Sequence, residues 1–149
     1  MHWTTHILTG ACWGYAIGSP PTAAASGFFG HIVLDAVPHH DPEEDWGYVL
    51  DSFLGASLLA ILFRKRRAGR PNRAMLWGAA GAALPDVELL RNVIRVTEKH
   101  ERIFPSHDGT IPHRDTDFRS SMMVEAALVG LSLLAAFIAG YRRHAMRRT

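Results

Sequence analysis

The chain has 149 residues, which is the size of one domain and is enough to bury a hydrophobic core without disulfide bonds. Its single cysteine, Cys12, excludes an intramolecular disulfide and a thiolate-rich zinc site, so a bound metal must be held by nitrogen and oxygen atoms. The formal net charge is only +2, and nine histidines lie mostly among acidic residues, which argues against a nucleic-acid-binding protein.

Helix signals dominate the chain, and the alternation of β-branched residues that is typical of strands is almost absent. The sequence therefore predicts one all-α domain over residues 1–149, a bundle of about five helices. The predicted helices cover, in chain order, residues 3–18, 22–37, 46–67, 73 to about 100 and 117–142. Pro20 and Pro38 follow the first two helices, and Pro85 interrupts the fourth.

Two of these helices contain apolar runs, at residues 52–63 and 122–140, that raise the question of a membrane. Residues 122–140 carry one charge, Glu125, and approach the length of about twenty residues that a bilayer requires. If the five helices cross alternately, the arginine clusters at 64–73 and 142–148 share one side, which the positive-inside rule makes cytoplasmic. The histidines and acids then face outward from a bacterial cytoplasmic membrane. The alternative is a soluble cytoplasmic bundle with basic helix ends. The N-terminus lacks a basic region followed by an apolar run, so no signal peptide is expected.

The segments 27–41 and 77–88 resemble each other, because both are small-residue helices that end in proline and acidic residues. This similarity indicates a possible internal duplication of a two-helix unit. A duplication would bring the equivalent helix ends together.

The polar residues at the predicted helix ends have the types and spacing of metal ligands. His31 and Asp35 lie four residues apart and therefore share one helix face. Such a pair can bind one divalent metal, or the acid can orient the histidine, or the two can form only a local hydrogen bond. Asp86 follows Pro85 in an apolar helix, where an acid is costly unless it is paired or bound to a cation.

The segment 106–117 is the densest polar stretch. Gly109 and Pro112 favour a tight turn that brings His107 and His113 toward one metal, although a surface loop is the alternative interpretation. His6, near the start of the first helix, is a further candidate ligand, whereas His2 is expected to be solvated. Glu125, a buried acid in the last helix, is expected to hydrogen-bond a ligand histidine. Of the adjacent His39 and His40, we expect at most one to face the site.

Four motifs together resemble the bacterial membrane-bound metal-dependent hydrolases, small helical proteins considered distantly related to zinc-dependent phospholipase C. The motifs are His6, Leu84-Pro85-Asp86-x-Glu88, His107-x-Gly109-x-x-Pro112-His113 and Gly30-His31-x3-Asp35. Here the His-x3-Asp helix precedes the Pro-Asp segment, Glu88 replaces an aspartate, and Asp108 replaces an arginine. The resemblance implies metal-dependent hydrolysis, with a phosphoester or a lipid-related molecule as substrate.

We therefore expect a metal-dependent hydrolase that holds roughly one to three divalent ions, with zinc as the expected metal. The expected ligands are His6, His31, Asp35, Asp86, His107 and His113. Asp86, Glu88 or Asp108 is expected to act as general base, and Arg114 to bind substrate charge. The expected partners are a small-molecule or lipid substrate and a membrane, without nucleic acid.

Two other functions remain open at this point. One is a non-catalytic metal-binding membrane protein for metal sensing or transport. The other is a helical membrane scaffold whose histidines are solvated. A surplus of candidate ligands favours catalysis over a closed structural site.

Overall fold

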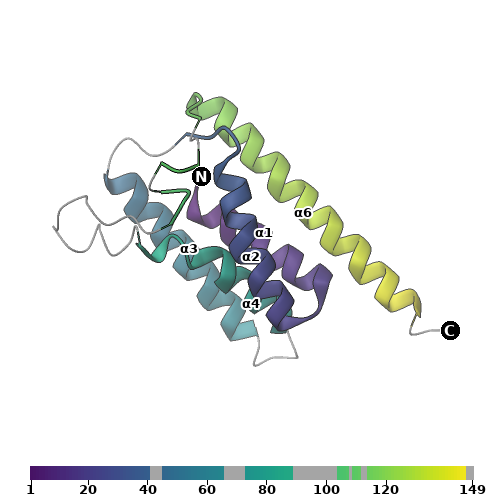
Figure 1. Ribbon diagram of the computed structural model, residues 1–149. Helices are drawn as coiled ribbons and strands as arrows, with labels where there is room; N and C mark the ends of the chain where they lie inside the picture. The colour runs from purple at the N-terminus through teal and green to yellow at the C-terminus, as the bar shows by residue number, and fades with distance from the viewer. Residues whose placement is uncertain (41–44, 66–72, 89–103, 108, 112–113, 147–149) are drawn as a thin grey trace.

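The computed structural model describes residues 1–40, 45–65, 73–88, 104–107, 109–111 and 114–146 of the chain (Figure 1). The described part contains five α-helices: α1 (Trp3–Ile17), α2 (Pro20–Asp35), α3 (Asp45–Lys65), α4 (Arg73–Ala83) and α6 (Phe118–Met146). These residues form no strand beyond one isolated parallel bridge, between His39 and Asp115. The prediction of an all-α bundle of about five helices is confirmed.

The helix ends differ from the predicted ones by a few residues. Helix α1 ends at Ile17, and the following Gly18 caps it with a positive φ of 79°, in the left-handed region where glycine has no steric penalty. Helix α2 begins at Pro20, two residues earlier than predicted, because proline is tolerated in the first turn, where its missing N–H has no partner to lose. Helix α4 ends at Ala83, and residues 84–86 form a turn. Of the predicted continuation to about residue 100, residues 87–88 are helical, and the part after residue 88 lies outside the described residues.

Helices α1, α2 and α4 pack so closely that their backbones touch at glycines. A Cβ atom at Gly10 of α1 would collide with the carbonyl of Gly78 in α4, and a Cβ atom at Gly78 would collide with the carbonyl of Gly10. Gly27 of α2 meets the same carbonyl of Gly78 from the other side. Close contact through small residues is common where helices associate in membranes. Gly78 therefore lies at the junction of all three helices.

The buried core continues from this junction toward the beginning of α1. Trp3, Ile7 and Ala11 pack against Ala79 and Ala83 of α4. The indole N–H of Trp3 donates a hydrogen bond of 3.1 Å to the carbonyl of Ala83. This contact places the first turn of α1 beside the last turn of α4.

The end of α2 lies in the same place. His31, in the last turns of α2, contacts the carbonyl of Ala82 in α4. The ends of α2 and α4, which are the two similar segments of the sequence, thus meet at the start of α1. This is the arrangement that an internal duplication predicts, although the duplication itself stays a prediction.

Helix α6 is the longest element and runs along one side of the bundle to the C-terminus (Figure 1). Among the described helices it is the one that is long and apolar enough to cross a membrane, and only 11% of its most apolar 18-residue window is buried. It packs mainly on α1. Large apolar side chains along it are exposed: Leu131, Leu133, Leu134, Phe137, Ile138 and Tyr141.

The basic end of α6 lies against the far end of α1. The guanidinium of Arg143 is 4.5 Å from the centre of the Tyr15 ring, and it donates a hydrogen bond to the carbonyl of Ala16. The ends of α2 and α4 are at the opposite end of α1, beside Trp3. The arginine-rich end of the last helix is therefore distant from the predicted site.

Candidate metal centre

The predicted pair His31 and Asp35 lies in the last turns of α2, and both side chains are buried. The i, i+4 spacing places His31 Nε2 at 3.0 Å from Asp35 Oδ2. The other ring nitrogen, Nδ1, lies 2.8 Å from the carbonyl oxygen of Ala82. Because a carbonyl only accepts hydrogen bonds, Nδ1 carries the proton. In a neutral His31 ring the lone pair of Nε2 therefore points toward carboxylate oxygens.

His6 reaches the same carboxylate from α1. Its side chain is completely buried, and its Nε2 lies 3.0 Å from Asp35 Oδ1. Its ring stacks on the ring of His31, with centroids 3.8 Å apart and planes inclined by 22°. Neither imidazole Nε2 has the alignment of an N–H···O hydrogen bond with Asp35. An ion pair with a protonated imidazole and a shared cation both fit this arrangement.

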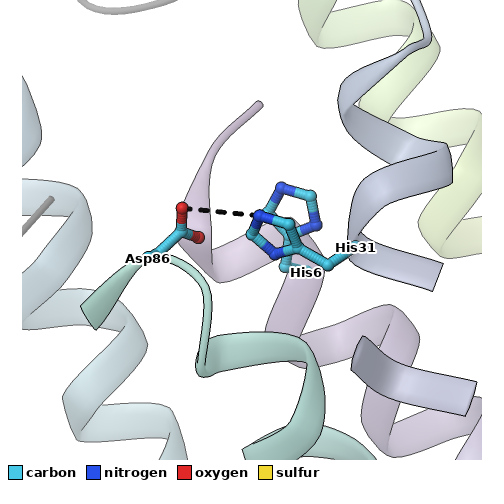
Figure 2. A group of neighbouring side chains, drawn as sticks. All are labelled: His6, His31 and Asp86. Carbon is cyan, nitrogen blue, oxygen red and sulfur yellow. Dashed lines mark ion pairs between the residues drawn. The ribbon is translucent and has the colours of Figure 1, made fainter. Parts of the chain in front are cut away.

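Asp86 and His107 complete the group. The turn after α4 places Asp86 Oδ1 at 3.6 Å from His31 Nε2 and at 3.4 Å from His107 Nε2. His107 Nε2 also lies 3.7 Å from Asp35 Oδ2. Figure 2 shows the carboxylate of Asp86 facing the stacked rings of His6 and His31. Five of the six predicted ligands are thus brought together.

The geometry and the charge of this group suit a divalent metal ion. Two sets of ligand atoms lie within 4.8 Å of one another: His6 with His31 and Asp86, and His31 with Asp35 and His107. The carboxylates of Asp35 and Asp86 bring negative charge that a cation would offset, and the N-terminal ammonium of Met1, 3.8 Å from Asp35 Oδ1, offsets part of it. Imidazole nitrogen with carboxylate oxygen is a donor set that zinc accepts, and a ligand histidine typically donates its other N–H to a carbonyl, as His31 does.

The burial and the charges of the group shift its pKa values. Burial lowers the pKa of His6 below its ordinary value of 6.5, against the opposing effect of Asp35. Burial also acts to lower the pKa of His31, but Asp35 and Asp86 outweigh it, so the pKa of His31 is raised. For Asp35, the nearby imidazoles of His31 and His6 overcome burial and hold the pKa far below its usual range. Asp35 is therefore ionised at neutral pH.

Glu88 lies beside the group rather than within it. Its Oε1 is 3.7 Å from Nδ1 of His107, on the ring edge that faces away from Asp35 and Asp86. Its Oε2 accepts a hydrogen bond from the backbone N–H of Phe104. A carboxylate behind a ligand histidine orients the ring and increases its basicity. This position suits an orienting role for Glu88.

The structure describes some of the remaining predicted site residues but not others. Asp108 and His113 lie outside the described residues, and nothing tests their predicted roles. Arg114 is exposed, and its backbone carbonyl accepts a hydrogen bond from the N–H of His39. His39 is the buried member of the pair at 39–40, with Nδ1 2.7 Å from the carbonyl of Val37, whereas the ring of His40 packs edge-on against Phe118.

A second buried polar group next to the site was not predicted. Glu125 of α6 accepts hydrogen bonds from His2, Thr5 and Ser121. The sequence suggested that Glu125 bonds a ligand histidine and that His2 is solvated. The structure instead pairs these two residues with each other. The only sequence signal was the isolated acid in an apolar helix, which requires a partner but does not identify it.

Comparison with known proteins adds no relative: no protein-family model, no curated protein and no solved structure matches the chain.

Proposed function

We propose that the protein is a metal-dependent hydrolase that binds zinc or a similar divalent ion. The proposed ligands among the described residues are His6, His31, Asp35, Asp86 and His107. The observation that carries the proposal is the set of partners of the two ring nitrogens of His31. Its Nδ1–H is committed to a carbonyl, while its Nε2 faces the carboxylates of Asp35 and Asp86 without a hydrogen-bond alignment. His113 remains a proposed sixth ligand.

A bound divalent ion supplies Lewis acidity, which polarises a phosphoryl or carbonyl oxygen and lowers the pKa of water. The chain supplies the proton acceptor. Asp86 directs Oδ1 to the histidines, while its buried Oδ2 has no hydrogen-bond partner among the described residues. We assign this oxygen the role of general base. Glu88 orients the ring of His107. Arg114 is proposed to bind substrate charge, and Asp108 is proposed to take part in proton transfer.

The proposed substrate is a phosphoester or a lipid-related ester. The motif resemblance supports this class, and the surroundings of Asp86 agree with it. Leu84 and Val87, next to Asp86 in the turn after α4, are 54% and 48% exposed. An apolar part of a substrate could contact these exposed side chains beside Asp86.

The proposed location is a bacterial cytoplasmic membrane, with α6 as the anchor and the site at the outer face. The exposed apolar surface of α6 supports contact with lipid, and its 29 residues span about 44 Å. Its N-terminal end lies beside the site, through the bond between His40 N–H and Ser121. Its other end carries Arg142 and Arg143, which favour the cytoplasmic side.

The metal proposal is tested by elemental analysis and by hydrolysis of phosphodiester, phosphomonoester and phospholipid substrates. Wild-type protein should contain stoichiometric zinc or a similar metal and turn over one of these substrates. His31→Ala should lose both properties, and His144→Ala, an exposed histidine at the other end of α6, should keep both. Metal-free wild-type protein overturns the proposal. Bound metal without turnover supports the alternative, a non-catalytic protein for metal sensing or transport.

The location is tested with single cysteines in a Cys12→Ser background. An impermeant maleimide applied to intact spheroplasts should label Asp117→Cys, beside the site, and should label Met146→Cys only after lysis. Recovery of the protein in the soluble fraction without detergent contradicts the membrane proposal. Labelling of Met146→Cys alone from outside reverses the proposed orientation.

A further inference from the structure

The hydrogen-bond network of Glu125 joins the apolar helix α6 to the turn that carries the first ligand. Glu125 is only 4% exposed, although most other side chains of its helix are exposed. Its Oε1 accepts bonds of 2.9 Å from His2 Nδ1 and 3.1 Å from Ser121 Oγ, and its Oε2 accepts one from Thr5 Oγ1. A buried carboxyl in an apolar helix is costly unless all its oxygens are satisfied, and here they are.

The same turn of α1 is held from its other side by α3. The carboxylate of Asp51 accepts hydrogen bonds from the backbone N–H groups of Trp3 and Thr4 and from the hydroxyl of Thr4. These N–H groups have no partner within their own helix. The first turn of α1 is therefore fixed by two carboxylates from two different helices, and His6 follows directly after Thr5.

The position of His6 depends on this turn because few other polar contacts hold the ring. Its Nδ1 is buried without a hydrogen-bond partner among the described residues, its Nε2 lies 3.0 Å from Asp35 Oδ1, and the ring also lies close to His31 and Asp86. Helix α6 packs mainly on α1. Helix α6 therefore reaches the first ligand through the segment from His2 to His6, and its Ser121 also accepts a hydrogen bond from the N–H of His40 after α2.

We propose that Glu125 is a positioning residue of the metal centre, which holds His2 and Thr5 so that His6 meets Asp35 and His31. This inference rests on the proposed metal site and adds a role for the apolar helix: α6 helps to set the geometry of a ligand on α1 through its contacts with His2 and Thr5. Metal affinity falls steeply when ligand atoms are displaced, and loss of groups that orient ligands typically costs 10–100-fold.

The test is titration of the full-length metal-free protein with Co²⁺, followed by calorimetry and by the visible absorption that reports coordination number. Glu125→Ala should weaken Co²⁺ binding at least about tenfold and change the absorption spectrum. Glu125→Gln, whose amide oxygen still accepts from Thr5, should restore most of the affinity. Thr5→Val should reproduce part of the loss. Ser132→Ala is the matched control, because Ser132 is buried on the same helix but bonds only the carbonyl of Leu128.

A double-variant comparison separates positioning from general loss of structure. In a His6→Ala background, Glu125→Ala should have no further effect on the residual affinity, whereas in a His107→Ala background its effect should persist. Equal effects in both backgrounds overturn the inference, as does a folded Glu125→Ala variant that binds Co²⁺ like wild type. Wild-type protein that binds no Co²⁺ overturns the metal site itself, which is a distinguishable failure.

Discussion

The imidazole rings of His6 and His31 stack with their centroids 3.8 Å apart, although the two residues belong to helices α1 and α2. The stack brings each Nε2 to a different oxygen of one carboxylate, Asp35, at 3.0 Å in both cases. Two buried imidazoles side by side repel each other when both are protonated. The pair is therefore suited to share one cation with Asp35 rather than to hold two protons.

Asp35 is the residue on which this arrangement depends most. Asp35→Asn keeps the size of the side chain but removes the charge that both histidines face, so metal affinity should fall by about 100-fold or more. Chelator competition with Zn²⁺ measures this loss. The exposed Asp115→Asn is the control and should bind as wild type does. An Asp35→Asn variant with unchanged affinity would show that the carboxylate is not a ligand.

Metal affinity should fall as the solution is made acidic. A metal ion binds neutral imidazole, and the pKa of His31 is raised above 6.5, so protons compete with the metal from that pH region downward. The pKa of His6 is lowered, and this ring remains available at lower pH. Zn²⁺ affinity measured between about pH 8 and pH 6 should therefore decrease toward the acid side, with proton release on binding. An affinity that rises on acidification contradicts the assignment of His31.

Gly78 should tolerate no side chain. Gly78→Ala places a methyl group against the backbone of Gly10, and overpacking of this kind destabilises by about 1–3 kcal/mol. Gly130→Ala, in an open position of α6, is the matched control and should be neutral or stabilising, because alanine is the better helix former. Thermal unfolding in detergent micelles, followed by circular dichroism, compares the two. Equal stability of both variants would refute the close approach of α1 and α4.

Much of the fold and several of the proposed ligands depend on local signals, and these could be predicted from the sequence. Gly18 and Pro38 mark helix ends because of their own backbone preferences, and His31 with Asp35 share a face through helical spacing alone. Asp86 was identified because an acid after Pro85 needs a partner. None of these inferences requires knowledge of a distant segment.

The unpredicted part depends on pairing between distant segments. Nothing at Glu125 indicates His2, and nothing at Asp51 indicates the backbone of Trp3, because these contacts follow from how α3 and α6 pack on α1. The early start of α2 at Pro20 was missed for another reason. Proline ends helices, which is how Pro20 was interpreted, but proline also fits the first turn of a helix.

Asp51 should stabilise α1 as a cap supplied by another helix. Asp51→Ala leaves the N–H groups of Trp3 and Thr4 without their acceptor, which should lower the free energy of unfolding by about 0.5–2 kcal/mol. Asp117, which accepts a bond from the N–H of Ser120 at the exposed start of α6, provides the comparison. Asp117→Ala should cost less. Chemical denaturation in mixed micelles measures both, and the reverse order of losses would contradict the role of Asp51.

The side chains around Asp35 come from positions as far apart as residue 6 and residue 107 of the 149-residue chain. A nascent polypeptide therefore exposes His6, His31 and Asp35 long before the ribosome has made their counterparts. An ion that needed the complete set of proposed ligands could bind only after most of the chain has emerged and α4 has packed against α1 and α2. Under the proposed function, metal would therefore bind late in the biogenesis of the protein, after helices α1, α2 and α4 have packed together.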